Sequence, residues 1–427
     1  MSFFNADNDM TTDKHNKRPN VPPLRFPEFT EPWETAKLGA IAEFSKGTGI
    51  SKEQRSETGL PCILYGELYT TYTNEVIEEV VSKTDLDPTD LVKSQKNDVI
   101  IPSSGETAED IATARCVTSD NVLLGGDLNI IRLVEPNDGR FMSYQLNGIR
   151  KYDIAKIAQG VSVVHLYGGD LKMLSVTFPQ SPEQKKIADC ISLLDRRISV
   201  QSGLIEDLKK IKKHLMEQLF CQPKEKSPRL RLVGMSGEWK RVRLCDVVQR
   251  VTTRNKTNEC TRVLTIAAQY GLIDQQEFFN KQIASSDLTT YYLLHRGDFA
   301  YNKSYSSDYP WGAVKRLDNY DEGVLSSLYI CFCPNKNIDS DFLRNYFEST
   351  KWYRGISEIS GEGARNHGLL NMSVDDYFNT THRFPSIEEQ RCISHLLNAF
   401  AHKILNEESI LDKLRSQKSY LLNNMFI

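Results

Sequence analysis

Two long stretches of the chain, residues 181–221 and 386–427, carry apolar side chains at the spacing of coiled-coil helices. An apolar residue recurs about every 3.5 positions, which places these residues along one face of a helix. The helix predicted in each stretch spans about 37 residues, or roughly 55 Å, which is longer than an ordinary core helix. The seam positions are Ile187, Ile191, Leu194, Ile198, Ile205, Leu208, Leu215 and Leu219 in the first stretch, and Ile393, Leu397, Phe400, Ile404, Leu411, Leu414, Leu421 and Met425 in the second. The pattern predicts two long helices that share a seam; two unrelated core helices are the alternative.

Both stretches begin with helix-start signals. The first offers Ser181 as the N-cap residue, Pro182 in the first turn and Gln184 three positions after the serine. The second has Ser386 followed by Glu389, the spacing of a capping box, in which each side chain bonds the other residue's backbone. These signals predict helices that start at 181 and 386.

The chain repeats itself at an offset of 206 positions, as in Trp33 and Trp239 (239 − 33 = 206). Both ends of the repeating unit and the polar breaks in the seam recur in register, which is improbable by chance. The matched pairs are Leu24-Arg25-Phe26 with Leu230-Arg231-Leu232, Leu38 with Leu244, Phe178-Pro179 with Phe384-Pro385, Glu183-Gln184 with Glu389-Gln390, Gln201 with Glu407, Lys212 with Lys418, and Leu219-Phe220 with Met425-Phe426. The repeat therefore indicates that the chain consists of two copies of one unit, a domain followed by a long helix.

The middles of the two copies differ and read as mixed α/β, with short apolar runs between polar, glycine-bearing turns. In the first we expect strands at Cys62–Tyr65, Val76–Val81, Asp98–Ile101, Ala114–Val117 and Asn129–Val134, and a helix at Phe141–Tyr152. In the second we expect strands at Arg262–Ile266, Asp298–Tyr301, Gly312–Arg316 and Leu328–Cys333, and a helix at Ser340–Trp352. The predicted organisation is a flexible tail 1–20, a domain 21–180, a helix 181–221, a linker 222–228, a domain 229–385 and a helix 386–427.

Composition narrows the class of protein. With 427 residues, 40% hydrophobic and 26% charged, the chain has the balance of a soluble globular protein. It has no apolar run long enough to cross a membrane, so we expect a cytoplasmic protein. Nine cysteines without zinc or redox spacing predict reduced thiols and no metal site. The net charge of −3 argues mildly against a nucleic-acid partner, unless basic loops or a basic companion supply the phosphate contacts.

The tandem Leu-Arg-Phe…Trp and Phe-Pro…Glu-Gln frames, the paired helices and the variable middles together resemble the specificity subunit of a type I restriction-modification system. The segments Lys46–Lys52 and Gly361–His367 also resemble segments of this family, whereas Gln159–His165 is only loosely like the second of them. The resemblance implies that each middle is a target-recognition domain for one half of a split, asymmetric DNA site. It also implies an antiparallel coiled coil that sets the spacer, and an internal pseudo-twofold repeat.

The same resemblance implies the partners of the chain. These are double-stranded DNA, two methyltransferase subunits that use S-adenosylmethionine, and restriction subunits that use ATP and Mg²⁺. The chain itself would hold no cofactor. Apolar residues outside the seam, among them Leu193, Leu204, Ile211 and Leu396, are expected to contact protein partners.

Basic, amide and hydroxyl side chains on glycine-bearing loops are the natural DNA contacts, because they pair with guanine, adenine or phosphate. In the first copy these are Lys46, Thr48, Ser51, Lys52, Ser103, Ser104 and His165. In the second they are Thr253, Arg254, Asn255, Lys256, Asn302, Lys303, Tyr305, Arg365, Asn366 and His367. For each one, a solvated surface or turn residue is the alternative.

Two other functions compete with DNA reading. An enzyme would need a catalytic signature, but the chain has neither a phosphate-binding Gly-x-x-x-x-Gly-Lys-Ser/Thr loop nor an Asn/Asp-Pro-Pro-Phe/Tyr tetrapeptide. A coiled-coil scaffold whose variable domains bind proteins would suit the helices and the charge. The scaffold does not explain why identical frames hold two different middles, so we expect a non-catalytic DNA-reading subunit.

Overall fold

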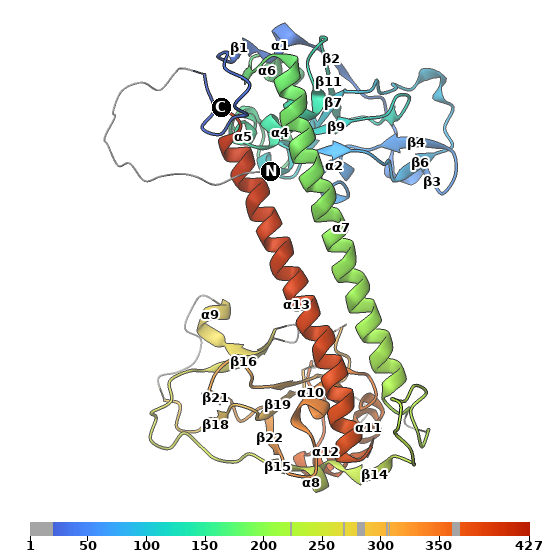
Figure 1. Ribbon diagram of the computed structural model, residues 1–427, viewed down its shortest axis with the longest axis vertical. Helices are drawn as coiled ribbons and strands as arrows, with labels where there is room; N and C mark the ends of the chain where they lie inside the picture. The colour runs from blue at the N-terminus through green and yellow to red at the C-terminus, as the bar shows by residue number, and fades with distance from the viewer. Residues whose placement is uncertain are drawn as a thin grey trace. The chain divides into compact units, whose positions relative to one another are not determined.

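The computed structural model describes residues 20–427, except 223, 268–269, 280–286, 305, 307 and 361–367. The chain forms two compact units. Unit 1 consists of residues 1–202 and 409–427, and unit 2 of residues 203–408. The two long helices, α7 (Ser181–Leu219) and α13 (Ile387–Asn424), therefore each contribute one end to either unit (Figure 1).

Unit 1 is a mixed α/β unit of short strands and helices. Its strands are β1 (Glu34–Lys37), β2 (Ala42–Lys46), β3 (Arg55–Ser56), β4 (Leu60–Ile63), β5 (Val76–Ile77), β6 (Ser82–Thr84), β7 (Val99–Pro102), β8 (Ser104–Gly105), β9 (Arg115–Val117), β10 (Leu123–Leu124), β11 (Leu128–Leu133), β12 (Val164–His165) and β13 (Ser175–Phe178). Its helices besides the ends of α7 and α13 are α1 (Leu38–Ile41), α2 (Glu67–Thr70), α3 (Ala108–Ile111), α4 (Gly139–Asn147), α5 (Lys151–Ile157) and α6 (Gly168–Lys172), with 3₁₀ turns η1 (Lys52–Gln54) and η2 (Pro88–Asp90).

Unit 2 has a similar order of elements. Its strands are β14 (Lys240–Arg243), β15 (Val248–Arg250), β16 (Leu264–Ala267), β17 (Gly271–Asp274), β18 (Tyr292–His295), β19 (Phe299–Asn302), β20 (Ala313–Arg316), β21 (Glu322–Leu325), β22 (Ile330–Pro334) and β23 (Thr381–Phe384). Its helices besides the ends of α7 and α13 are α8 (Leu244–Val247), α9 (Gln275–Phe279), α10 (Ser340–Glu348), α11 (Tyr353–Ile359) and α12 (Val374–Asn379).

Each unit is built on a sheet with the same arrangement of strands. The sheet of unit 1 has the order β2-β11-β7-β9-β5, and that of unit 2 the order β15-β22-β19-β20. In unit 1, β11 is antiparallel to both β2 and β7, and in unit 2, β22 is antiparallel to both β15 and β19. The two strands that flank each central strand therefore run in one direction and end at one edge of the sheet.

The residues of the repeat meet in a buried ion pair at the start of each long helix. In unit 1 the Arg25 Nε and Nη2 atoms each donate to Glu183 at 2.7 Å, and the Trp33 indole N–H lies 3.4 Å from the same carboxylate. In unit 2, Arg231 donates to Glu389 at 2.9 and 2.7 Å, and Trp239 at 3.3 Å. Each carboxylate lies in the first turn of its helix, where the helix dipole stabilises negative charge.

Aromatic packing closes each core around the far end of a long helix. In unit 1 the ring of Phe141 lies 5.7 Å from Trp33 and 5.0 Å from Phe426, which follows the end of α13. In unit 2 the ring of Phe342 lies 6.1 Å from Trp239 and 5.4 Å from Phe220, which follows the end of α7. Since Phe220 and Phe426 are matched in the repeat, both cores are completed in the same way.

Within each unit the ends of α7 and α13 run antiparallel. In unit 1, Ile187 shares the core with Met425, while Asp195, further along α7, pairs with the earlier Lys418 at 2.7 Å. In unit 2, Leu219 shares the core with Ile393, while the earlier Lys209 pairs with the later Glu408 at 2.6 Å. All sixteen predicted seam residues are buried or half-buried.

The polar breaks of the seam attach the helices to the domains. Lys418 pairs with Glu75 at 2.5 Å as well as with Asp195, and Lys212 pairs with Glu348 at 3.1 Å. Matched lysines thus contact a carboxylate of the domain in both units.

Most of the predicted elements are present, and the exceptions have local causes. The helix predicted at Phe141–Tyr152 is two helices, α4 and α5, separated at Gly148. The helix predicted at Ser340–Trp352 ends at Glu348, where the Ser349 hydroxyl donates to the Tyr346 carbonyl and the backbone becomes extended. Of Val76–Val81, only Val76–Ile77 is a strand.

The predicted capping box at the start of α13 forms only in part. The Ser386 hydroxyl accepts from the Glu389 N–H at 3.4 Å, but the Glu389 carboxylate turns to Arg231 and Trp239 instead of to Ser386. In the first copy, Gln184 likewise turns away from its own helix and accepts from the Asp138 N–H at 2.9 Å. Both side chains join the helix to the domain.

Replacing Glu183 by Gln should destabilise unit 1 by about 2 kcal/mol or more, because the Arg25 guanidinium is left without its buried counter-charge. Glu389→Gln should do the same to unit 2. Urea denaturation of the full chain measures both effects. The matched control is Glu28→Gln, which removes an exposed ion pair with Lys186 and should cost less than about 1 kcal/mol. Equal effects of control and test variants would contradict a structural role for the buried pairs.

The stability of unit 2 should fall as the pH drops from about 6.5 to 4. The His382 ring is buried, with Nδ1 2.9 Å from the Tyr346 hydroxyl and Nε2 2.8 Å from the Thr380 hydroxyl, and burial lowers its pKa to about 4. Because the unfolded chain binds the proton more tightly, stability is full above pH 6.5 and about 3 kcal/mol is lost on acidification. Unit 1 has Val176 at the position that matches His382. The variant His382→Val should therefore reduce this pH dependence in urea denaturation, and an unchanged dependence would rule out His382 as its source.

Candidate nucleic-acid interface

In unit 1 the predicted contact residues follow strands that end at one edge of the sheet. Lys46 of β2 and Ile101 of β7 both lie opposite Asn129 of β11, so the loops after these two strands start at the same level. Between them lies the turn 125–127 that precedes β11. The topology therefore brings Lys46–Lys52 next to Ser103 and Ser104.

Backbone hydrogen bonds join these loops. The Thr48 N–H of the first loop donates to the carbonyl of Leu124, which directly precedes the turn 125–127, at 3.0 Å. The Ser103 N–H donates to the Asp127 carbonyl at 2.7 Å, and the Leu166 N–H donates to the Ser103 carbonyl at 3.0 Å. His165 pairs with Ser104 between β12 and β8. We call residues 46–52, 103–105, 125–127 and 164–167 loop edge 1.

Unit 2 has the same construction. Arg250 ends β15 opposite Phe332 of β22, and β19 runs in the same direction, from Phe299 to Tyr301, toward the start of β22, so the segments that follow β15 and β19 leave from one edge. The turn 326–329 precedes β22 there. Ser304 forms a bridge with Leu369, as Ser104 does with His165 in unit 1. We call residues 251–256, 302–304, 326–329 and 369 loop edge 2.

The bridges relate the two glycine-bearing stretches of the sequence. Gln159–His165 ends in the strand that pairs with Ser104, and residues 361–367 come shortly before Leu369, which pairs with Ser304. The predicted contacts Tyr305, Arg365, Asn366 and His367 lie outside the described residues.

The described contact candidates differ in exposure. Those exposed to solvent are Lys46, Ser51, Lys52, His165, Thr253, Arg254 and Lys256, those half-buried are Thr48, Ser104, Asn302 and Lys303, and those buried are Ser103 and Asn255. Among the residues that the structure describes, Lys46, Lys52 and Lys256 form no ion pair. These three ammonium groups are free to meet phosphate.

Two of the predicted contacts, Asn255 and Ser103, are buried and hold their loops instead of facing solvent. The Asn255 amide is 3% exposed, donates to the Cys260 carbonyl at 2.8 Å and accepts from the Cys260 N–H at 3.3 Å. The Ser103 hydroxyl is buried and lies 3.4 Å from the Asp127 carboxylate. Burial and these bonds within the loop leave little of either side chain accessible to a base edge.

Several other candidates, exposed or half-buried, make a local bond. The Thr48 hydroxyl accepts from the Val92 N–H at 2.9 Å, and the Asn302 side chain accepts from the Ser304 N–H at 3.0 Å. Ser51 caps the 3₁₀ turn η1. The Arg254 guanidinium donates to the Thr290 carbonyl at 2.7 Å and lies over the Tyr292 ring. These bonds fix the loops in position, which is what a precise reader of bases requires.

Sequence reasoning missed the turns that precede the central strands. Asp127 is exposed at a positive φ of 58° beside Ser103, and Leu328 in the matching turn is 75% exposed. Tyr167 is 48% exposed and its ring stacks 6.2 Å from that of His165. The Gly125-Gly126 pair was the available signal for the first turn.

The described residues hold no group of three His, Cys, Asp or Glu side chains that could bind a metal ion. No helix in the described part of the chain is long and apolar enough to cross a membrane.

Comparisons of sequence with known proteins find one family. Residues 30–210 match the type I restriction modification DNA specificity domain. The putative type I restriction enzyme MjaX specificity subunit of Methanocaldococcus jannaschii is 26% identical over 223 residues, which are 48% of this chain and 49% of that protein. The chain thus matches about half the length of this curated relative.

Comparisons of structure extend the likeness to nearly the whole chain. The S subunit of a type I restriction-modification system from M. genitalium has a TM-score of 0.60 at 17% identity, over 95% of this chain and 99% of that one. A structure from work on complex assembly and conformational transition of the type I R-M system has a TM-score of 0.53 at 14% identity, with the same coverage. The predicted fold class, two mixed α/β domains with two long helices, is confirmed. The resemblance to type I specificity subunits is also confirmed, by sequence over residues 30–210 and by fold over nearly the whole chain.

Proposed function

We propose that this chain is the DNA sequence-recognition subunit of a type I restriction-modification complex. Loop edge 1 reads one half of a split, asymmetric site and loop edge 2 reads the other half, while α7 and α13 fix the spacer between the halves. The chain directs methyltransferase and restriction subunits to this site. The family match over residues 30–210 supports the proposal.

The observation that carries the proposal is the pair of loop edges. Each follows two parallel strands on either side of a central strand, so the frame that presents the loops is the same in both units. The presented side chains differ: Lys46 and His165 in one, Arg254 and Lys256 in the other. One docking geometry with two sets of donors and acceptors is what an asymmetric split site requires.

Methylation and cleavage belong to the partner subunits in this proposal, and the chain has no catalytic role. S-adenosylmethionine would be bound by the methyltransferase subunits, and ATP with Mg²⁺ by the restriction subunits. The side chains of Thr48 and Arg254 make bonds that hold the loops in position, a role that needs no catalytic chemistry.

Two methyltransferase subunits would bind this chain, one for each copy of the repeat. The helices offer apolar side chains outside the seam: Leu193 is 64% exposed, Leu204 42% and Ile211 47%. Leu396 does not belong to this surface, because it packs against the core of unit 2. Partners that close around DNA would also supply the phosphate contacts that a chain of net charge −3 lacks.

Cells that express this chain together with its methyltransferase subunit should methylate a single split, asymmetric motif. Cells with the methyltransferase alone should not. Genome-wide methylation mapping measures both, and Lys46→Ala/His165→Ala should relax one half of the motif and leave the other intact. A soluble, assembled complex that methylates no motif would favour the scaffold function. Loss of both halves in the double variant would contradict separate reading by the two edges.

Gly47→Ala should weaken specific DNA binding of the assembled complex about tenfold, the loss expected from one displaced base contact. A Cβ atom at position 47 would lie 2.0 Å from the Gly125 carbonyl oxygen, so the first loop must move away from the turn beside it. The matched control is Gly49→Ala in the same loop, where a Cβ atom meets nothing within 4 Å. Fluorescence anisotropy with a duplex that contains the mapped motif compares the two. Equal affinities would show that the position of this loop is unimportant for binding.

A further inference from the structure

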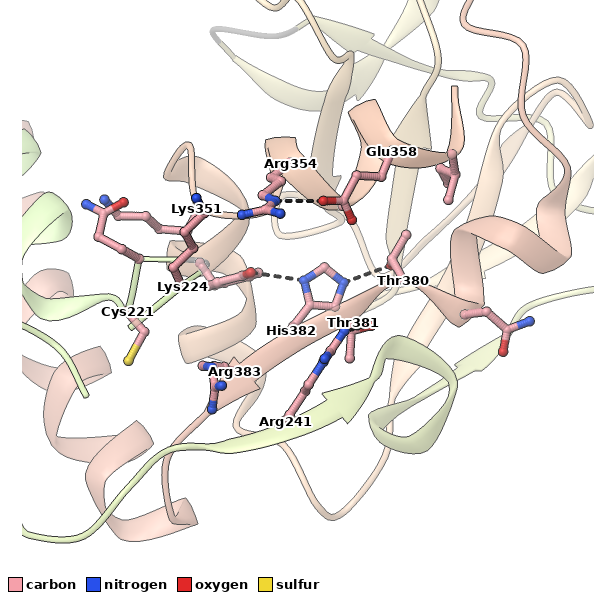
Figure 2. A pocket seen from close by; sticks show the side chains of 15 residues that line it. Cys221, Lys224, Arg241, Lys351, Arg354, Glu358, Thr380, Thr381, His382 and Arg383 are labelled. Carbon is pink, nitrogen blue, oxygen red and sulfur yellow. Dashed lines mark hydrogen bonds and ion pairs between the residues drawn. The ribbon is translucent and has the colours of Figure 1, made fainter. Parts of the chain in front are cut away.

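A polar cavity of about 300 Å³ lies in unit 2 (Figure 2). Its walls come from β14, β23, α11 and the residues that follow α7. Five lysine and arginine side chains line it against one carboxylate, that of Glu358: they are Lys224, Arg241, Lys351, Arg354 and Arg383. This excess of positive charge is unexpected in a chain whose net charge is −3.

Two of the arginines face each other across a pair of strands. Arg241 of β14 lies directly opposite Arg383 of β23, so both side chains stand on the same face. The Arg241 guanidinium donates to the Thr381 hydroxyl at 3.4 Å, and that of Arg383 to the Trp239 carbonyl at 3.1 Å. Neither has a carboxylate within ion-pair distance in the described part of the chain. Like charges in this position destabilise a strand pair unless an anion lies between them.

Unit 1 shows that the fold does not need these arginines. The matched strands β1 and β13 place Thr35 opposite Thr177, each 206 positions before its arginine, and the two hydroxyls lie 3.1 Å apart. The matching cavity of unit 1 shares only the α5 side and residues 173–175: it is lined by two cations, Arg150 and Lys156, and two carboxylates, Asp153 and Asp170, but not by Thr35 or Thr177. The paired arginines therefore belong to unit 2, and the strand pair of unit 1 forms without them.

The other charges of the cavity are already partnered. Lys351 pairs with Glu217, and Arg354 pairs with Glu358 at 2.6 Å. His382 is buried between two hydroxyl groups and adds no charge at neutral pH, because burial lowers its pKa to about 4. Arg241, Arg383 and the exposed Lys224 remain to meet an anion.

We propose that Arg241, Arg383 and Lys224 bind the phosphate group of a small ligand, such as inorganic phosphate, pyrophosphate or a nucleotide. Two guanidinium groups offer the paired donors that match phosphate oxygens, and the ammonium group adds a third charge. None of the residues that line the cavity belongs to loop edge 2. The proposed site therefore uses none of the residues assigned above to DNA reading.

The test compares the full chain with the variant Arg241→Thr/Arg383→Thr, which copies the threonine pair of unit 1. Isothermal titration calorimetry is carried out with phosphate, pyrophosphate and ATP, in chloride buffers of matched ionic strength. The native chain should bind at least one of these three ligands. The double variant should bind that ligand at least about tenfold more weakly, because two charge-assisted contacts are lost. The control Lys151→Gln/Lys156→Gln removes two charges beside the matching cavity of unit 1 and should leave the affinity unchanged.

Thermal unfolding gives a second readout that separates binding from folding. In chloride the double variant should unfold no earlier than the native chain, because a pair of like charges is removed, and only the native chain should gain stability from the phosphate ligand. Equal affinity of the two chains, or no binding by the native chain at millimolar ligand, would overturn the proposal. A variant that loses affinity for duplex DNA but binds phosphate and nucleotides normally would instead assign the arginines to the DNA backbone.

Discussion

The buried carboxylate at the start of each long helix is the contact on which the architecture depends. Glu183 and Glu389 are 1% and 3% exposed, and each is bonded by an arginine and a tryptophan from a segment about 150 residues earlier in the chain. A buried carboxylate without such donors would be strongly unfavourable. Each unit must therefore bring the segment before its first strand to the start of the long helix, which follows its last strand. This contact fixes the direction of that end of the helix within the unit.

This fixed frame leaves the loop edges free to vary. The inner strand that ends at each edge, β7 in unit 1 and β19 in unit 2, is buried in its sheet, and its register is set by the apolar face of the core. The loops after them need only satisfy their own backbone groups, which Thr48, Asn255 and Asn302 do with side-chain bonds. Side chains that point outward do not bond these backbone groups, so substitutions there can change what is recognised at little cost in stability.

The periodic and repeated parts of the sequence predicted their structure well. The helices start within a residue of 181 and 386 and bury the predicted seam, because a 3.5-residue repeat and a repeated frame are strong local and global signals. The breaks after Asn147 and Glu348 were missed, since a single glycine or a serine-to-backbone bond leaves little trace in periodicity. The burial of Ser103 and Asn255 was missed as well, because residue type alone does not tell a side chain that reads DNA from one that closes a turn.

The way in which α13 completes unit 1 bears on the order in which the chain can fold during synthesis. Unit 2 is one continuous segment, residues 203–408, whereas unit 1 needs residues 409–427, with Met425 and Phe426 in its core. On the ribosome the first domain must wait, with Phe141 lacking its contact with the Phe426 ring, until the second has been made. Loss of Met425 and Phe426 would therefore damage the domain that is translated first.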